Sequence, residues 1–190
     1  MNAVLLCGSP RKNGNTELLL TRCKSKFESA SIKTTLVHCA DTIVKPCLAC
    51  GACRKRADMT CVITDDDFAK VFRLICDADI VVCGTPVYFG SATPNLMTIL
   101  DRVGYVARSN GGLLSRKIGG PLVVARRAGQ NFTYAQLMYW YMINDMIVPG
   151  STYWNIAFGR EAGEVENDEE GIATIDRFSD NLVWLAGKLF

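Results

Sequence analysis

Four cysteines lie close together in the stretch KPCLACGACRKRADMTC. Cys47, Cys50, Cys53 and Cys61 have the spacing Cys-x2-Cys-x2-Cys-x7-Cys. Three thiolates separated by two residues each converge on one face of an iron–sulfur cluster, and a fourth completes its ligand set. Four thiolates also bind zinc, although structural zinc sites usually join two separated Cys-x2-Cys pairs. The pattern favours an iron–sulfur centre, with zinc and unligated loop thiols as the alternatives.

A second stretch with recognisable chemistry is the polar loop GSPRKNGNT, which follows an apolar run and precedes an amphipathic one. It lacks both the GK[ST] ending of a Walker loop and the GxGxxG fingerprint. Ser9, Asn15 and Thr16 are short donors ahead of a predicted helix, Gly14 permits close approach, and Arg11 adds charge. Free N–H groups at a helix start bind anions. The loop predicts a monophosphate site suited to FMN; the alternative is a turn in which Asn15 or Thr16 caps the helix.

Two adjacent aromatic residues, Tyr88 and Phe89, follow a predicted strand in the stretch GTPVYFGSATPNLMTILDRV. Side chains of this kind form a flat wall against a planar ring. The backbone N–H groups of residues 88–91 are then placed to meet acceptors on the ring. The alternative is that one or both aromatic residues pack within the fold or at an oligomer contact.

The chain has one histidine, His38, which we interpret as structural. Mechanisms that use a Ser-His pair or a His-bound metal are therefore disfavoured. A cofactor must carry the chemistry, while the protein supplies orientation and electrostatics. Arg126 and Arg127 follow another predicted strand and are candidates to stabilise negative charge on a reduced ring. Surface pairing with carboxylates is the alternative for either arginine.

These stretches alternate with apolar runs typical of strands buried on both faces of a parallel sheet. Segments with helical spacing follow the runs, so the chain is expected to form a three-layer α/β sandwich with right-handed crossovers. A five-stranded sheet of this type has the flavodoxin-like order 2-1-3-4-5. The predicted strands are 3–7, 34–38, 79–85, 121–125 and 146–151.

Ligands in such sheets bind at the carboxyl ends of the strands. The loops Ser9–Thr16, Pro86–Thr93 and Arg126–Phe132 are therefore expected to form one site. The cysteines lie in a loop of about residues 45–64, between the second strand and the next helix. We expect a single domain over residues 1–190.

The composition excludes several classes of function. A net charge of +2 offers no electrostatic case for nucleic acid, and no run is long enough for a membrane helix. The first residues lack the basic region of a signal peptide, and nine cysteines without such a signal indicate a reducing, cytoplasmic location. The cysteines outside the cluster are expected to be structural.

The chain resembles the NADPH-dependent FMN reductase-like group of flavodoxin-fold proteins. The motifs that carry the resemblance are GSPRKNGNT, TPVYFGSATPNLMTILDR and RRAGQ, in that order. The resemblance implies that the first loop holds the FMN phosphate, the second lies along the isoalloxazine and the third closes over the ring. The implied phosphate contacts are Ser9, Arg11, Asn13, Asn15 and Thr16. The implied ring contacts are Pro86, Val87, Tyr88, Phe89 and Gly90, with Arg126 nearby.

Two further charged residues of the second motif, Asp101 and Arg102, are expected to pair within the fold or at a subunit contact.

The cysteine loop is similar to that of the iron–sulfur flavoproteins, a branch of the same group from anaerobic microbes. That resemblance implies a 4Fe-4S cluster beside FMN. The x7 gap lies at the long end of the motif, and the cations Arg54, Lys55 and Arg56 within it are a departure. They would offset the charge of a cluster or attract an acidic redox partner.

The expected function is that of an FMN-dependent oxidoreductase or electron-transfer iron–sulfur flavoprotein. Electrons would pass in pairs at the flavin and singly through the cluster, with NAD(P)H or a redox protein as donor or acceptor. One alternative is an NAD(P)H-dependent FMN or quinone reductase without a metal; another is a nonenzymatic, flavodoxin-like carrier. The broadly apolar helix 134–146 predicts a homodimer or homotetramer through Tyr139, Trp140, Tyr141 and Met142.

Overall fold

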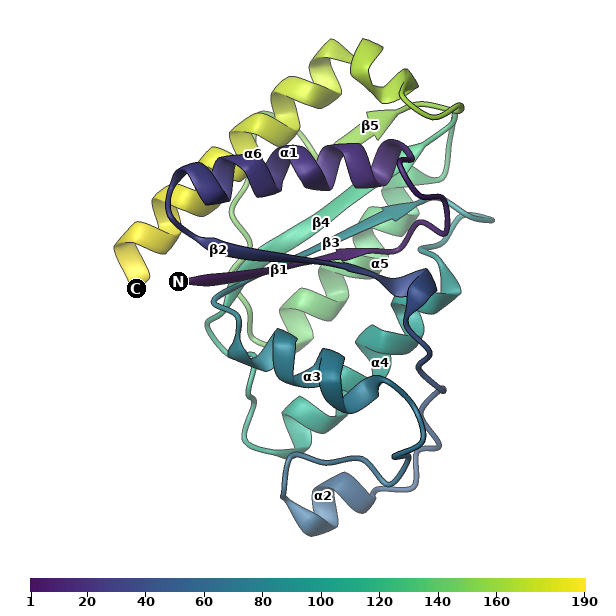
Figure 1. Cartoon of the computed structure of the whole chain (residues 1–190), viewed down its shortest axis with the longest axis vertical. Coiled ribbons are helices and arrows are strands. Elements are labelled where there is room, and N and C mark those ends of the chain that lie inside the picture. The colour runs from purple at the N-terminus through teal and green to yellow at the C-terminus, as the bar shows by residue number, and fades with distance from the viewer.

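The computed structural model describes residues 1–190 and contains a five-stranded parallel sheet of order β2-β1-β3-β4-β5 (Figure 1). This topology confirms the expected α/β sandwich. Central strands such as β3 and β4 are buried on both faces, which explains their continuous apolar runs. The strands are β1 (Asn2–Cys7), β2 (Lys33–His38), β3 (Ile80–Pro86), β4 (Ile118–Ala125) and β5 (Ile156–Phe158).

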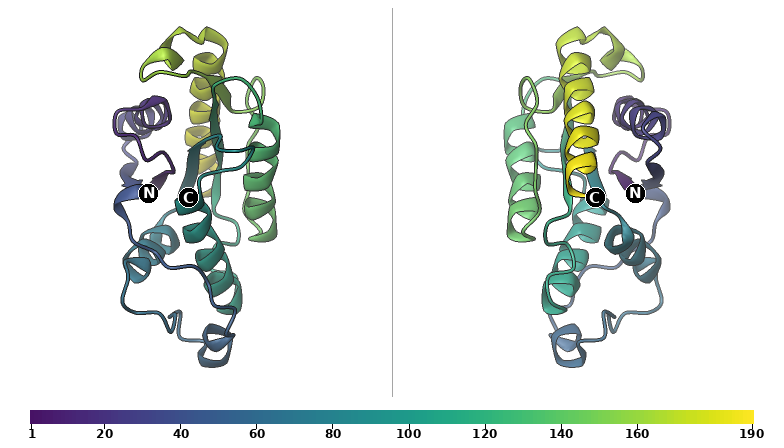
Figure 2. Two further views of the ribbon diagram at one scale, coloured as in Figure 1. Left: turned by 90° about the vertical axis from the view of Figure 1, so that its right-hand side faces the viewer. Right: turned by 90° about the vertical axis from the view of Figure 1, so that its left-hand side faces the viewer.

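Helices cover both faces of the sheet. The α-helices are α1 (Asn15–Ser29), α2 (Ala52–Arg56), α3 (Phe68–Asp77), α4 (Pro94–Ser109), α5 (Gln130–Ile143) and α6 (Glu169–Leu189), and two short 3-10 helices are η1 (Cys39–Asp41) and η2 (Glu164–Asn167). Helices α1 and α6 pack on one face, while α3, α4 and α5 pack on the other (Figures 1 and 2). The sheet therefore separates two apolar cores.

The prediction of the fifth strand was wrong. Within the predicted range 146–151, Ile147 forms only an isolated bridge to Ile118, and the strand that pairs with β4 is β5, farther along the chain. Pro149 follows two residues after the bridge and has no N–H to donate to a sheet ladder. The chain therefore leaves the sheet there and returns at Ile156.

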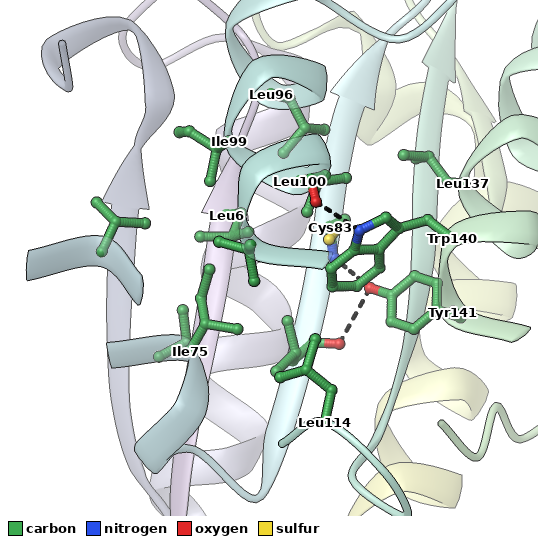
Figure 3. Packing of buried hydrophobic residues seen from close by; sticks show 14 of the residues in the cluster. Leu6, Ile75, Cys83, Leu96, Ile99, Leu100, Leu114, Leu137, Trp140 and Tyr141 are labelled. Carbon is green, nitrogen blue, oxygen red and sulfur yellow. Dashed lines mark hydrogen bonds between the residues drawn. The ribbon is translucent and has the colours of Figure 1, made fainter. Parts of the chain in front are cut away.

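Helix α5 was expected to expose four large side chains, and this was wrong for two of them. Trp140 is 8% exposed and Tyr141 is fully buried, whereas Tyr139 and Met142 lie on the surface. The Trp140 indole N–H donates to the carbonyl of Leu100 on α4 at 2.7 Å (Figure 3). A helix that is apolar on all sides does not indicate by its pattern which side meets the core.

The Tyr141 hydroxyl is inserted between β3 and β4. It accepts from the Cys83 N–H at 3.0 Å (Figure 3). It also lies 2.9 Å and 3.1 Å from the carbonyl oxygens of Gly120 and Val81, to which its own hydrogen can be donated. Burial raises the pKa of Tyr141 well above its ordinary value. The hydroxyl therefore stays neutral and connects the two central strands through their backbones.

The cysteine loop, residues 45–64, lies between β2 and α3 and includes the short helix α2. It extends from one end of the molecule and packs against the second half of α4 (Figures 1 and 2). The Met59 N–H donates to the Asn110 side chain just after that helix at 2.9 Å. None of the helices has the length and apolar character that crossing a membrane requires.

Candidate functional site

A cavity of about 380 Å³ lies at the carboxyl edge of the sheet. Its wall is built from the loop after β1, the first residues after β3, Arg126 after β4, and residues 159–162 after β5. Ligand sites in sheets of this topology lie at this edge, and cavities of this size hold small molecules. The structure thus brings together parts of all three loops that the sequence indicated, and adds a fourth.

The first loop presents backbone donors to this cavity. Helix α1 starts after Gly14, and its first hydrogen bond runs from the Leu18 N–H to the Gly14 carbonyl at 3.0 Å. The N–H groups of Asn15 and Thr16 precede that bond and have no helical partner. Both residues are buried and line the cavity, as does Ser9, whose hydroxyl accepts from the Arg11 N–H at 3.2 Å. This arrangement suits an anion at the positive end of the helix.

The side chain of Asn15 is occupied by a contact with the loop after β5. Its Nδ2 donates to the Glu161 carbonyl at 2.9 Å, and its Oδ1 accepts from the N–H groups of Gly163 at 2.9 Å and Val165 at 3.4 Å. The phosphate contact predicted for Asn15 is therefore left to its backbone N–H. The side chain instead joins two walls of the cavity.

The loop after β3 turns sharply beside the cavity. Tyr88 and Ser91 exchange backbone hydrogen bonds at 2.9 Å and 3.1 Å, and both residues between them, Phe89 and Gly90, have positive φ. Tyr88 lines the cavity after Pro86 and Val87, whereas Phe89 projects fully into solvent. Of the two aromatic residues, only Tyr88 lies where a ring could stack.

Threonine side chains hold these two loops together. The Thr93 hydroxyl donates to the Gly8 carbonyl at 2.7 Å, and the Thr93 N–H donates to the Thr85 hydroxyl at 3.1 Å. The Val87 N–H donates to the Val124 carbonyl on β4 at 2.9 Å. The cavity wall is therefore fixed by hydrogen bonds between segments that are distant in sequence.

Three arginines line the cavity, and one of them was missed in the sequence. Arg11 and Arg126 were expected, whereas Arg160 follows β5, in a segment for which the sequence indicated no role. Arg11 donates to the Arg160 carbonyl at 3.5 Å, and Arg160 pairs with Glu161 at 3.1 Å. The signal that could have found Arg160 is the short apolar run Ile156–Phe158 before it, which was not predicted to be a strand.

Several predicted residues do not line this cavity. Asn13 is exposed with a φ of 55°, and its N–H donates to Glu17 at 2.6 Å. Glu17 also lies 3.4 Å from the imidazole of His38, in agreement with a structural interpretation of the histidine. Phe89 and Gly90 occupy the tip of the turn, and Arg127 is exposed beyond the wall.

The four clustered cysteines line a second, smaller cavity between the cysteine loop and α4. Cys53 is buried against the core, Cys47 and Cys61 are half-buried, and Cys50 is exposed. The Ala49 N–H donates to the Cys47 sulfur at 3.4 Å. The sequence spacing therefore corresponds to a common location of the four thiols in the structure.

The fit of this site to a metal centre depends on the ligand type and on the available space. Four thiols in a mainly apolar wall, which also includes Arg102 and Tyr105, match the ligand chemistry of an iron–sulfur cluster, and a backbone N–H is directed at one sulfur. No three His, Cys, Asp or Glu side chains lie close enough together to hold a single ion. The cavity that the four thiols line has a volume of about 20 Å³. Binding a cluster therefore requires the thiols and the loop around them to rearrange.

The remaining cysteines have surroundings that suppress ionisation. Burial raises the pKa of Cys7 and Cys23 to about 11 and that of Cys83 to about 12. It also raises the pKa of Cys39 and Cys76. Thiolates are the reactive and ligating form, so these five thiols are poor candidates for chemistry.

Arg102 pairs within the fold, as one of the two expectations for it stated. It forms an ion pair with Asp66, and both side chains are 1% exposed. Burial on its own would raise the pKa of Asp66, but hydrogen bonds from the Lys45 N–H, Arg102 and the Phe68 N–H lower it below the ordinary value. Asp101 is exposed and makes no ion pair.

Comparison with known proteins agrees with this geometry. Residues 1–161 match the profile of the NADPH-dependent FMN reductase family. The chain is 31% identical over 180 residues to an iron-sulfur flavoprotein of Methanosarcina thermophila, covering 93% of this chain and 91% of that protein. It is 29% identical over 186 residues to an iron-sulfur flavoprotein of Methanocaldococcus jannaschii, with 92% and 91% covered.

Solved structures show the same fold at lower identity. RosB, with bound 8-demethyl-8-formylriboflavin-5'-phosphate, superposes with a TM-score of 0.75 at 19% identity, covering all of this chain and 81% of RosB. The apo form of the NADH:FMN oxidoreductase EmoB superposes with a TM-score of 0.69 at 16% identity, covering 97% and 89%. An archaeal flavodoxin has a TM-score of 0.66 at 11% identity over 98% and 99%.

The family match spans most of the chain, including three of the four segments that meet at the carboxyl edge and the first three residues of the fourth. The expectation of a flavin-dependent oxidoreductase, which the motifs gave, is confirmed by this family match. The chain therefore belongs to the NADPH-dependent FMN reductase family, as a flavin-dependent oxidoreductase with a flavodoxin-like fold.

Proposed function

We propose that this chain binds FMN noncovalently in the cavity at the carboxyl edge, and a 4Fe-4S cluster on Cys47, Cys50, Cys53 and Cys61. In this proposal it is an FMN-dependent oxidoreductase that transfers electrons between NAD(P)H and a redox partner. FMN supplies two-electron chemistry and the cluster supplies one-electron transfer when they are bound. The protein supplies binding, orientation and charge.

The observation that carries the flavin site is the meeting of three features in one cavity. The N–H groups at the start of α1, the Tyr88 side chain and three arginines all line the same space of about 380 Å³. An anion at the helix start and a flat ring beside Tyr88 use these features together. FMN combines a phosphate with a planar ring system, so it matches both parts of the cavity wall.

Individual residues have distinct roles in this proposal. The N–H groups of Asn15 and Thr16 and the Thr16 hydroxyl hold the phosphate, with Arg11 at its outer side. Tyr88 excludes water from one face of the ring. Arg126 lies at the exposed margin of the cavity, where its positive charge favours electron density on the ring.

The proposal of a cluster is supported by the common location of the four thiols and by the names of the two relatives. The cysteine loop is held at its base, where the Lys45 N–H donates to Asp66 and the Ile43 N–H donates to Asp67, each at 2.9 Å. Most residues between Cys53 and Cys61 are exposed. The loop can therefore rearrange around a cluster while its base keeps its position.

The proposal also includes the electron donor, the location of the protein and its oligomeric state. The chain shows no dinucleotide fingerprint, so the nicotinamide of NAD(P)H would visit the ring face transiently. Nine cysteines without a disulfide suit a reducing cytoplasm. The exposed side chains Tyr139, Met142 and Ile143 on α5 suit a contact within a homodimer or homotetramer.

The phosphate site is tested by comparing FMN with riboflavin, which lacks the phosphate. Thr16→Val removes a hydroxyl at nearly constant shape from a residue that is 2% exposed. A hydrogen bond to a charged group contributes about 1.5–3 kcal/mol, so the Kd for FMN, measured by flavin fluorescence, is expected to rise at least about tenfold. The Kd for riboflavin is expected to stay the same.

Asn13→Gly is the matched control, because glycine tolerates the positive φ and Asn13 does not line the cavity. Its affinity for FMN is expected to equal that of the wild type. Equal weakening of FMN and riboflavin binding by Thr16→Val would contradict the phosphate assignment. A preparation that takes up no FMN would contradict the whole proposal.

The cluster is tested by anaerobic purification and iron analysis. About four irons per chain together with FMN are expected, and Cys50→Ala is expected to lose the iron but not the flavin. Flavin without iron, with turnover of NAD(P)H and an artificial acceptor, would instead select a reductase without a metal. Flavin without such turnover would select an electron carrier.

A further inference from the structure

The guanidinium of Arg102 is buried on α4 at the base of the cysteine loop. One of its terminal nitrogens pairs with Asp66 and donates to the Lys45 carbonyl at 2.9 Å, and the other donates to the Ile63 carbonyl at 3.3 Å. The guanidinium carbon lies 4.0 Å from the centroid of the Phe68 ring. Arg102 therefore contacts the chain on both sides of the four cysteines.

One donor of this guanidinium has no partner. The Nε–H of Arg102 is buried and makes no hydrogen bond. Leaving a buried donor unpaired is costly, and more so on a charged group. The two terminal nitrogens of Arg102 have three acceptors between them, whereas Nε has none. This difference requires an explanation.

The surroundings of Arg102 limit what the missing acceptor can be. Arg102 lines the same small cavity as Cys47, Cys50, Cys53 and Cys61. Apart from Tyr105, the other side chains of this wall are apolar. Besides the Tyr105 hydroxyl, the side-chain acceptors of this wall are the four cysteine sulfurs. Sulfur as a thiolate, or as the sulfide of a cluster, carries the negative charge that suits a cationic donor.

We propose that Arg102 donates its Nε–H to a sulfur of the cluster and raises the reduction potential of that cluster. The inference rests on the cluster of the proposed function. One-electron reduction adds one negative charge to the cluster and breaks no bond, and the proton stays on Nε. Asp66 offsets most of the guanidinium charge, so the main effect is that of the N–H···S hydrogen bond. Such a bond stabilises the more negative, reduced form, and hydrogen bonds to the sulfurs are known determinants of cluster potentials.

The ion pair with Asp66 helps to fix the orientation of the Arg102 guanidinium. Asp66 and the two carbonyl oxygens fix the terminal nitrogens, so the guanidinium plane has little freedom to turn. Lysine carries the same charge but has no planar fork and no second nitrogen within its chain. Replacing arginine by lysine therefore separates the hydrogen bond from the charge.

The test compares Arg102→Lys with the wild type after both are loaded with iron and sulfide. Iron per chain and the midpoint potential from an EPR-monitored titration are measured. We expect unchanged iron and a fall of at least about tenfold in the equilibrium constant for reduction, which is about 59 mV for a one-electron couple. Arg54→Lys is the matched control, because Arg54 adjoins Cys53 but is exposed, and its potential is expected to match the wild type.

A second variant tests whether the result for Arg102→Lys arises from misfolding. Arg102→Leu combined with Asp66→Leu removes the buried pair together, because removing one partner alone leaves an uncompensated charge. It is expected to bind iron and to have a lowered potential as well. If both variants bind iron with an unchanged potential, the proposed role of Arg102 is overturned. Loss of iron from both variants would also overturn it, because the residue would then be purely structural. Absence of iron from the wild type would instead contradict the cluster itself.

Discussion

Single side chains in this protein connect elements that are far apart in sequence. Asn15 was identified because its amide suits an anion, yet both ends of that amide bind the backbone of residues 161–165. The structure gives this side chain a different partner from the phosphate that was predicted for it. Thr16, the next residue, keeps its place in the cavity wall.

The hydroxyl of Tyr141 offers a direct measurement of such a connection. Tyr141→Phe leaves the Cys83 N–H without its acceptor inside the sheet. An unsatisfied buried donor costs about 1–3 kcal/mol, so the free energy of unfolding in urea is expected to fall by that amount with an unchanged m value.

Tyr139→Phe is the control for this substitution, because Tyr139 lies on the same helix and is 71% exposed. Its effect is expected to stay within about 0.5 kcal/mol. Equal stability of Tyr141→Phe and the wild type would show that the hydroxyl does not support the pairing of β3 with β4.

At the level of elements, α4 links the two sites. It begins with Pro94 directly after the loop that carries Tyr88, and Arg102 lies eight residues later, about 12 Å along the helix axis. Any shift of α4 therefore acts on the cavity at one end and on the cysteine loop at the other. Within the cysteine loop, helix α2 packs against α4, and Arg102 of α4 holds the base of the loop.

The pairing of Asp66 with Arg102 predicts how the cysteine loop responds to acid. The pKa of Asp66 is lower in the folded chain than its ordinary value, so the unfolded chain binds more protons as the pH falls. This contribution to stability is present above the ordinary carboxyl pKa of about 4 and is lost as the pH falls through the lowered value. The free energy of unfolding, measured in urea from pH 7 down to pH 3, is expected to decrease over that range.

Asp66→Asn is expected to be less stable than the wild type at pH 7 and to lose less stability on acidification. The Lys45 and Phe68 N–H groups donate to different oxygens of Asp66, so asparagine keeps an acceptor for only one of them and the variant removes a hydrogen bond together with the charge. Asp101→Asn is the control, because this exposed carboxylate makes no ion pair and its pH profile is expected to match the wild type. Parallel profiles for the wild type and Asp66→Asn would contradict the prediction.

At the scale of the whole molecule, the two proposed centres lie in different parts of the chain. The flavin cavity is at the carboxyl edge of the sheet, and the cysteine loop extends beyond the second half of α4 (Figure 2). The exposed apolar residues of α5 lie outside both sites. Assembly through that surface would leave the residues of each site in place.

The proposed assembly is tested by placing a charge in this surface. Met142 is 66% exposed and adjoins Ile143, which is 60% exposed. Because a buried, unpaired carboxylate is costly in an interface, Met142→Glu is expected to reduce the mass measured by light scattering to that of one chain. Trp184→Gln on α6, where Trp184 is 63% exposed, is expected to keep the wild-type mass. A monomeric wild type would remove the proposal.

The sequence by itself determined the first four strands and the order of the sheet, the edge of the sheet at which the cavity lies, and the grouping of four thiols in one loop. These features follow from local signals. Continuous apolar runs identify buried strands, polar residues between a strand and a helix identify binding loops, and close spacing keeps the cysteines near one another whatever the rest of the chain does.

Only the tertiary structure decided which segment completes the sheet, which side of α5 is buried, and what surrounds Arg102. The segments 146–151 and 156–158 are both short and apolar, and the choice between them depends on pairing with β4. That choice also placed Arg160 in the cavity wall. Such outcomes depend on contacts between residues far apart in sequence, and a local pattern holds no information about the partner that a side chain will meet.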